Sequence, residues 1–423
     1  MRNKHPFCGI PYTMRIPLLR TEIATLGFVG TLLVAGGCEN PNEADPIPEG
    51  SRRLAVGAAT ACALDPGGKV YCWGLNSNLL EYGTSIVASS GTPVSVPVPT
   101  LRSISSGWGQ HKCGVTTINA VCWGRGLSGQ IGDGTLGAAG NPPTQVSVQE
   151  QWADISTGRL TTCAINSSSE AFCWGLNQYG EVGDTLLPTG TRQQIANRVV
   201  GGVKFATVVA GWLHTCGIST AGIVYCWGNN MSGQLGIGAI DSVPHGKPTP
   251  IASTLLFKKI SLSARATCAV SVDGQLLCWG YNGLGQLGDG TLETHSTPTP
   301  VSGNRKWKDV ALGNGFAEGT VAVAPTGLAQ GGVTHACAID DNDAAYCWGW
   351  NGAGQLGDGT TTSRQVPTAV SSTIKFSSLA LGAAYSCGMS GSAIYCWGAN
   401  STGQLGIGTT QDSAQPVKVH TSW

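Results

Sequence analysis

Charged side chains are scarce in this chain of 423 residues. Asp, Glu, Lys and Arg make up 11% of the sequence, against roughly 25% in an ordinary soluble domain. So little Glu and Lys argues against long helices and coiled coils, which are rich in both. The 24 basic residues are matched by 24 acidic ones, so the chain lacks the basic surplus that nucleic-acid binding requires.

Glycine and cysteine, by contrast, are abundant. The chain has 62 glycines and 16 cysteines, and 41% of its residues are hydrophobic, which is too many for a disordered chain. Many glycines together with an even number of cysteines indicate a turn-rich β protein from an oxidising compartment.

The first 37 residues have the composition of an export signal. Four basic residues precede or flank the start of an apolar run from Ile23 to Ala35, which ends in two glycines. This order is typical of a secretory signal, and the run is too short for a spanning helix. We therefore predict a signal peptide over residues 1–37, with Met14 as an alternative start.

Cys38 directly follows the small residues at the end of this run. The arrangement resembles the lipobox of bacterial lipoproteins, in which this cysteine becomes the lipidated first residue, although Ala35 stands where the motif prefers Leu. We predict Cys38 as a lipid anchor, with plain secretion as the alternative. Residues 38–50, rich in proline and acids, form a predicted tether. Beyond residue 37 the chain has 20 basic and 23 acidic residues, so we expect membrane contact through the lipid alone.

Seven repeats account for residues 51–423. The tripeptide Cys-Trp-Gly occurs seven times at intervals of 49 to 69 residues, and a second cysteine precedes each by 9 or 10 residues. A period near 50 residues is typical of arrays and propellers. Both faces of the strand pair between the cysteines are apolar, so each sheet must be covered on both sides. Radially stacked sheets provide that cover, and we predict an all-β, seven-bladed β-propeller.

The two cysteines of each repeat lie opposite one another in the predicted hairpin. In the last repeat, a two-residue turn at Gly391-Ser392 places Cys387 and Cys396 in a non-hydrogen-bonded pair, where Cα atoms lie about 4.5 Å apart. This spacing is within the range for a disulfide, whereas two cysteines per repeat do not make a four-ligand zinc set. We predict seven disulfides: Cys62–Cys72, Cys113–Cys122, Cys163–Cys173, Cys216–Cys226, Cys268–Cys278, Cys337–Cys347 and Cys387–Cys396.

The phase of the repeat predicts how the ring closes. A bulky residue lies 11 positions before the first cysteine in four repeats: Trp152, Phe205, Phe257 and Phe376. The first repeat has Ser51 there, while the chain ends at Trp423 after the Pro-x-x-Val pattern that precedes Trp152 and Phe376. We therefore predict that strands from both chain ends complete one blade, which leaves no free sheet edge.

Two further motifs point to a known family. Most repeats continue after Trp-Gly with Asn-x-x-Gly-Gln-Leu-Gly-x-Gly-Thr, as in Asn282–Thr291, and several carry Gly-x-x-His before the first cysteine, as in Gly211–Cys216. They resemble the regulator of chromosome condensation repeat, whose family forms seven-bladed β-propellers and acts chiefly through protein contacts. The first repeat departs from the motif, with Asn76-Ser-Asn-Leu-Leu-Glu-Tyr-Gly. The paired cysteines are foreign to the nuclear members, so the resemblance implies an exported bacterial one.

No residue set indicates catalysis, a cofactor or a metal site. The glycine-rich motif lacks the Lys-Ser/Thr of a phosphate loop, and one acid per repeat, as at Asp289, is too sparse for calcium. Three histidines lie two positions before a first cysteine, where other repeats have Thr, Ala or Tyr. We interpret these histidines as packing residues: His111, His214 and His335. We expect no enzyme activity and no cofactor.

Three tryptophans and one insertion are the candidates for partner contact. Trp108 and Trp212 resemble positions that the ultraviolet-sensing plant member of the family uses, but two copies are too few for an exciton cluster. Trp350 is the third. One repeat is about 18 residues too long, through an insertion near residues 313–331, and such insertions often lie on the binding face. Its apolar candidates are Phe316, Val321 and Val323; a loop without a partner is the alternative.

These observations lead to two functional hypotheses. The first is a monomeric, non-catalytic scaffold at the bacterial periplasm or cell surface, which binds an unidentified envelope or extracellular protein. The alternative is an envelope glycan-binding or hydrolytic propeller, which requires acids or histidines gathered on the axial face of several blades.

Overall fold

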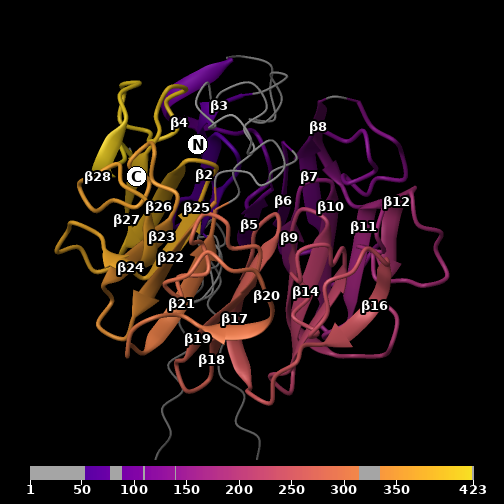
Figure 1. Cartoon of the computed structure of the whole chain (residues 1–423). Helices are drawn as coiled ribbons and strands as arrows, with labels where there is room; N and C mark the ends of the chain where they lie inside the picture. Colours follow the sequence, from indigo (N-terminus) through magenta and orange to yellow (C-terminus); the bar gives the residue numbers. More distant parts are fainter. Residues whose placement is uncertain (1–52, 77–87, 108–109, 139, 314–333, 422–423) are drawn as a thin grey trace, which may run out of the picture. The chain divides into compact units, whose positions relative to one another are not determined.

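The computed structural model describes residues 53–76, 88–107, 110–138, 140–313 and 334–421. All of them belong to one compact unit, which spans Ala44–Trp423 (Figure 1). Within these ranges the chain forms strands and turns, and no helix there could cross a membrane. The predicted signal peptide, Cys38 and the tether lie outside the described residues.

The described strands form seven antiparallel sheets, the blades, each built from four consecutive strands. The first four blades are β1 (Leu54–Val56), β2 (Thr60–Leu64), β3 (Val70–Leu75), β4 (Ser89–Ser95); β5 (Ser103–Ser106), β6 (His111–Val115), β7 (Ala120–Gly124), β8 (Asn141–Gln145); β9 (Trp152–Thr157), β10 (Thr161–Asn166), β11 (Ala171–Asn177), β12 (Thr191–Arg198); and β13 (Phe205–Ala210), β14 (His214–Ser219), β15 (Val224–Gly228), β16 (His245–Pro250). The last three are β17 (Phe257–Leu262), β18 (Ala266–Ser271), β19 (Leu276–Gly280), β20 (His295–Pro300); β21 (Trp307–Leu312), β22 (His335–Asp340), β23 (Ala345–Gly349), β24 (Arg364–Ala369); and β25 (Ser378–Leu381), β26 (Tyr385–Ser390), β27 (Ala393–Gly398), β28 (Ser413–Lys418). The predicted seven-bladed β-propeller is confirmed.

The order of strands defines two faces of the propeller. The first strand of each blade lines a central channel, and the fourth lies at the far edge of its sheet. Because the strands are antiparallel, the first-to-second and third-to-fourth connections emerge together, on what we call the long-loop face. The second-to-third hairpins and the blade-to-blade connections emerge on the opposite side, the hairpin face.

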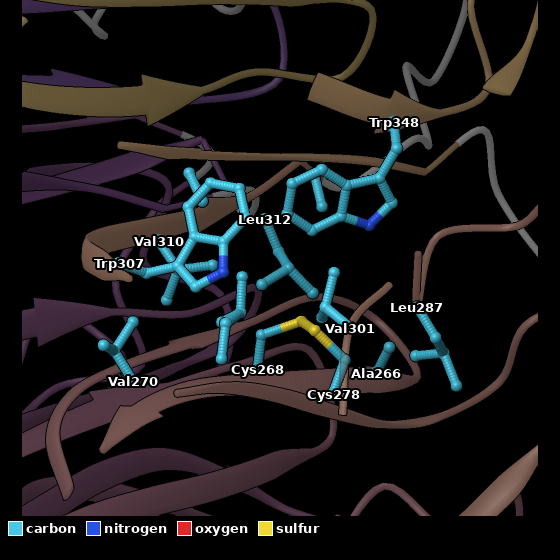
Figure 2. Packing of buried hydrophobic residues seen from close by; sticks show 13 residues of the cluster. Ala266, Cys268, Val270, Cys278, Leu287, Val301, Trp307, Val310, Leu312 and Trp348 are labelled. Carbon is cyan, nitrogen blue, oxygen red and sulfur yellow. A yellow bond between two sulfur atoms is a disulfide. The ribbon is translucent and has the colours of Figure 1, made fainter. Parts of the chain in front are cut away.

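The hydrophobic core lies between neighbouring blades. Figure 2 shows it between the fifth and sixth blades, where the disulfide Cys268–Cys278 and Val270 pack in one cluster with Trp307 and Trp348. Every blade contributes to two such clusters, one on each side of its sheet. This arrangement explains why both faces of the hairpins are apolar and why each repeat needs its neighbours to fold.

All seven predicted disulfides are present. Their Cα atoms lie 4.0–4.1 Å apart, slightly closer than the separation that we expected for a non-hydrogen-bonded pair. The register matches as well: Cys387 lies opposite Cys396, and Ser390 opposite Ala393 closes the two-residue turn. Each bridge therefore joins the two central strands of one blade.

The Gly-Gln-Leu-Gly motif holds the next blade in place. Trp279 of the fifth blade donates a hydrogen bond from its indole Nε1 to the carbonyl oxygen of Gln234 in the fourth blade, at 3.0 Å. Leu235 is fully buried. Gly236 has a φ of 69°, and a Cβ there would lie 2.6 Å from the Trp279 Nε1. The motif recurs because a tryptophan of the following blade packs against it, and glycine leaves room for that ring.

The predicted exchange of strands at ring closure is wrong. β1 pairs with β2 and β28 with β27, so both end blades consist of consecutive strands. The aromatic residue that we used to set the phase begins an innermost strand, as Trp152 does in β9, and therefore marks a boundary between blades. Ser51 and Trp423 lie outside the described residues. The ring closes instead through an apolar cluster shared by the first and seventh blades, which includes Leu54 and Cys387.

Candidate functional site

Two of the predicted binding tryptophans lie on the long-loop face. Trp212 is in the connection between β13 and β14, and Trp350 directly follows β23. Both are partly exposed. The guanidinium of Arg159, from the third blade, lies 4.5 Å from the centroid of the Trp212 ring, and its backbone N–H donates to the Gly211 carbonyl at 3.1 Å. This cation–π contact fixes the ring between neighbouring blades.

Trp350 and Tyr281 occupy equivalent positions after the Cys-Trp-Gly tripeptide. Each ring lies against a glycine of its own loop: a Cβ on Gly352 would lie 2.3 Å from the Trp350 ring, and one on Gly283 would lie 2.2 Å from the Tyr281 hydroxyl. Both rings are partly exposed. Because the loop glycines support them, these aromatic rings present a defined surface to solvent.

Arg265 completes a set that we call the aromatic–arginine arc: Arg159, Trp212, Arg265, Tyr281 and Trp350. It spans the third to sixth blades on the long-loop face. The acid Asp358 on the same face is engaged elsewhere. Burial disfavours the charged form of Asp358, but hydrogen bonds from Thr360 and Arg364 outweigh it and lower the pKa of Asp358. The arc therefore combines aromatic surface with positive charge.

The remaining sequence candidates lie outside the described residues. These are Trp108 and the insertion residues Phe316, Val321 and Val323. The described strands that flank the insertion, β21 and β22, are the first and second of the sixth blade. In the other blades, the connection between the first and second strands emerges on the long-loop face.

The three histidines do more than fill space. His214 Nε2 lies 3.0 Å from Thr267 Oγ1 in the next blade, and Thr267 Oγ1 donates to the Gln234 carbonyl. The hydroxyl must therefore accept its second bond from the imidazole, which assigns the Nε2–H tautomer. His111 and His335 make the same link, to Thr162 and Ser386. Burial lowers the pKa of each histidine to about 3, so all three are neutral links between blades.

The loop acids are held by internal hydrogen bonds. Asp289 accepts bonds from the Thr291 N–H and hydroxyl, and its other oxygen lies 2.7 Å from His295 Nε2. Across the described ranges, no three His, Cys, Asp or Glu side chains are placed to share a metal ion.

The fold and its repeated motifs define a propeller in which a recurring tryptophan of one blade donates a hydrogen bond to the backbone carbonyl of a recurring glutamine in the preceding blade. We call this contact the latch. The chain belongs to the regulator of chromosome condensation (RCC1) repeat family. One model of that repeat matches residues 221–270, 273–317, 342–389 and 392–422, and a second matches residues 52–78, 152–181, 205–234 and 257–286.

Relatives of known function share this similarity. The ultraviolet-B receptor UVR8 of Arabidopsis thaliana is 28% identical over 310 residues, 71% of this chain and 65% of the receptor. The human E3 ubiquitin-protein ligase HERC2 is 28% identical over 327 residues, 75% of this chain and 6% of the ligase. Protein pim1 of Schizosaccharomyces pombe is 27% identical over 348 residues, 75% of this chain and 62% of its own length. The chain therefore spans less than two thirds of each relative.

Solved structures show the same fold. Human WBSCR16 superimposes with a TM-score of 0.68 at 20% identity, covering 79% of this chain and 85% of its own. Prp20p of Saccharomyces cerevisiae gives a TM-score of 0.68 at 19% identity, covering 88% of this chain and 87% of its own.

Proposed function

We propose that this chain is a non-catalytic, protein-binding propeller of the bacterial cell envelope, held to a membrane by a lipid on Cys38. Relatives support the binding role: Prp20p has been studied for its binding to Gsp1p and histones, and yeast RCC1 has been crystallised bound to Kap60. The partner of this chain is a different one, because seven disulfides and the composition of residues 1–37 favour an oxidising compartment outside the cytosol.

The aromatic–arginine arc carries the proposal. Trp, Tyr and Arg are the residue types that dominate binding energy in protein interfaces, and the arc presents all three. The Arg159–Trp212 contact and the glycine-supported rings hold these side chains in place before binding, which reduces the conformational entropy that a partner must overcome.

The test is a binding comparison with matched variants. Wild-type protein and an Arg159→Ala/Trp212→Ala double variant are immobilised and exposed to envelope extract, and captured proteins are identified by mass spectrometry. A control variant, Lys375→Ala, removes an exposed cation from the hairpin face. We expect a partner that wild type and control retain and that binds the double variant about 30-fold more weakly or worse, the loss of a 2 kcal/mol hot spot.

Two results would count against this role. One is a partner that binds all three proteins equally, which would place the interface elsewhere. The other is binding to a glycan array without any protein partner, which would favour the glycan-binding alternative. Thermal unfolding of the double variant checks that it is folded.

The lipid anchor has its own test. Cells that express the full chain are labelled with radioactive palmitate, beside a Cys38→Ala variant. We expect label in the wild type alone and release of the variant from the membrane fraction. Equal behaviour of the two proteins would contradict the anchor and favour plain secretion.

A further inference from the structure

The innermost strands alternate between two environments. Residues such as Leu54, Ile104, Ile155 and Val310 are buried between blades. The residues between them line a central channel of about 610 Å³, to which all seven blades contribute. This is the period-two pattern of a strand. One set of side chains faces the core between blades, and the other set faces the channel, as it would face solvent in a sheet with one exposed side.

Successive levels of the channel differ in chemistry. The innermost residues that lie opposite the first cysteine of each blade are small: Ala55, Ser105, Ser156, Val209, Ser261, Ala311 and Ala380. Two residues earlier, one level nearer the hairpin face, every blade presents a polar side chain. These seven channel-lining residues, the polar ring, are Arg53, Ser103, Asp154, Thr207, Lys259, Asp309 and Ser378.

The polar ring carries both signs of charge. Arg53 and Lys259 are basic, and Asp154 and Asp309 are acidic. Burial raises the pKa of Asp309, while the charge of Lys259 and the backbone N–H groups of Val310 and Leu379 oppose that rise. The described side chains of Lys259 and Asp309 form no ion pair within 4.0 Å of each other, although the Lys259 charge acts on Asp309.

Two buried donors on adjacent blades have no acceptor among the described residues. They are the Nε of Arg53 and the hydroxyl of Ser103, whose side chain is 6% exposed. The Arg53 guanidinium is held by a bond from its Nη2 to the Leu64 carbonyl at 3.3 Å. Buried polar atoms are nearly always satisfied, and two donors without an acceptor, on adjacent blades at one level of a channel, fit a carboxylate.

The mouth of the channel favours anions. Arg102 and Lys258 also line it, each one residue before a member of the polar ring, and both are exposed. A cleft lined by positive charge raises the local concentration of anions. A ligand bearing only negative charge, however, would meet Asp154 and Asp309 at the level of the ring.

We propose that the polar ring is a binding site for a small zwitterion, an amino acid or short peptide, whose carboxylate is bound by Arg53 and Ser103 and whose amine is bound by Asp309. The channel volume lies within the range of small-molecule sites, about 300–1,000 Å³. This site lies on the channel axis and is independent of the aromatic–arginine arc.

Titration calorimetry on the disulfide-intact protein tests the site. The probes are the twenty amino acids and the dipeptide Ala-Ala, with acetate, methylammonium and inorganic phosphate as ions that carry one sign of charge. We expect saturable binding of at least one zwitterion, and at least tenfold weaker binding of each of the three ions. Arg53→Ala and Asp309→Asn should each weaken zwitterion binding tenfold or more, and Ser103→Ala should weaken it less.

The control is Lys306→Ala, which removes a cation on the hairpin face whose Nζ bonds the Asp273 carbonyl at 2.7 Å. It should leave binding unchanged. Failure of every zwitterion to bind the folded protein overturns the proposal. It is also overturned if the Arg53 and Asp309 variants bind the zwitterion as tightly as the wild type does. If phosphate or acetate binds as tightly as a zwitterion, the polar ring is a simple anion site, and the proposal is overturned as well. None of these results depends on a protein partner being found.

Discussion

The indole of Trp73 in the first blade donates a hydrogen bond of 3.0 Å to the carbonyl oxygen of Gln404 in the seventh. The same bond, from the tryptophan indole of one blade to the carbonyl oxygen at the motif glutamine position of the preceding blade, joins each pair of neighbouring blades in which the structure describes both residues. Here it closes the ring across 331 residues of sequence. The first and seventh blades are therefore joined by the same contact that joins neighbouring blades elsewhere in the ring, and no strand is exchanged between them.

Loss of this closing bond should cost more than loss of the bond between the fourth and fifth blades. There, Gln234 accepts from both Trp279 and Thr267, whereas the first blade has Ala61 at the threonine position, as the sixth has Ala336. Trp73→Phe should leave the Gln404 carbonyl without a donor from the described residues, at a cost of about 1–3 kcal/mol, while Trp279→Phe leaves Thr267 in place. Denaturant unfolding of the two variants, which lose the same ring volume, should show Trp73→Phe as the less stable by about 1–2 kcal/mol. Equal stabilities would contradict a role for the second donor on the glutamine carbonyl.

Glu181 should make the stability depend on pH. It replaces the motif glutamine in the third blade and is 1% exposed. One oxygen accepts from the Tyr179 N–H at 2.7 Å, and the other has no partner in the described part of the chain. Burial raises the pKa of Glu181 from 4.5 to about 7, despite opposing backbone hydrogen bonds. Between these values the unfolded chain ionises while the folded one does not, so stability falls as pH rises from about 4.5 to 7.

Glu181→Gln should remove this loss, with a gain on the order of 3 kcal/mol above pH 7 and none below pH 4.5. Thermal unfolding across that range measures the gain. The reverse change, Gln355→Glu, places a carboxyl at the equivalent position of the sixth blade and should introduce the same dependence. A gain that is identical at pH 4 and pH 8 would show that ionisation of Glu181 plays no part.

The buried histidines predict a separate loss in acid. Because burial lowers the pKa of His214 from 6.5 to about 3, the unfolded chain takes up a proton first as pH falls below 6.5, and folded stability decreases until about pH 3. His214→Ala, which copies Ala266 of the fifth blade, should cost about 1 kcal/mol at pH 7 and reduce the slope below pH 6. A steeper acid slope in the variant would refute this account. Equilibrium unfolding at pH 7, 5 and 4 supplies the comparison.

Each disulfide should contribute a small share of stability. The bridge between Cys268 and Cys278 closes a loop of ten residues, worth at most about 2.5–3 kcal/mol in chain entropy, and the hairpin turn already brings its ends together. Cys268→Ala/Cys278→Ala should therefore lower stability by less than that limit and retain the fold. Cys38→Ala serves as the control and should unfold like the wild type. Mass spectrometry after alkylation should find no free thiol among the fourteen repeat cysteines.

Features that recur in every repeat could be predicted from the sequence, whereas features that occur in one repeat only could not. Seven copies of one pattern were enough to place Cys387 opposite Cys396 and to recognise the blades, because each copy repeats the same turn and pairing. The recurring glutamine was a signal for the latch that we did not interpret. Glu181 is its single acidic replacement among the described repeats, and one exception to a pattern does not indicate a buried carboxyl.

The polar ring had no such signal, because its members differ in every repeat and become neighbours only when the ring closes. Arg53 and Asp309 are far apart in the chain and belong to no shared motif. Trp307 was missed as the start of an innermost strand because the insertion moved it away from its usual distance before the first cysteine. Strand exchange at ring closure was expected because the spacing of the repeats shows where one repeat ends and the next begins. It does not show whether that point lies within a blade or between two blades.

The closing latch also acts as a test of completeness. A chain is made from its amino end, so Trp73 exists long before Gln404 does. Until the last repeat is made, the first blade keeps one apolar side without a neighbour, and every truncated product has the same defect. We expect proteases and chaperones to distinguish finished molecules from unfinished ones by this single seam.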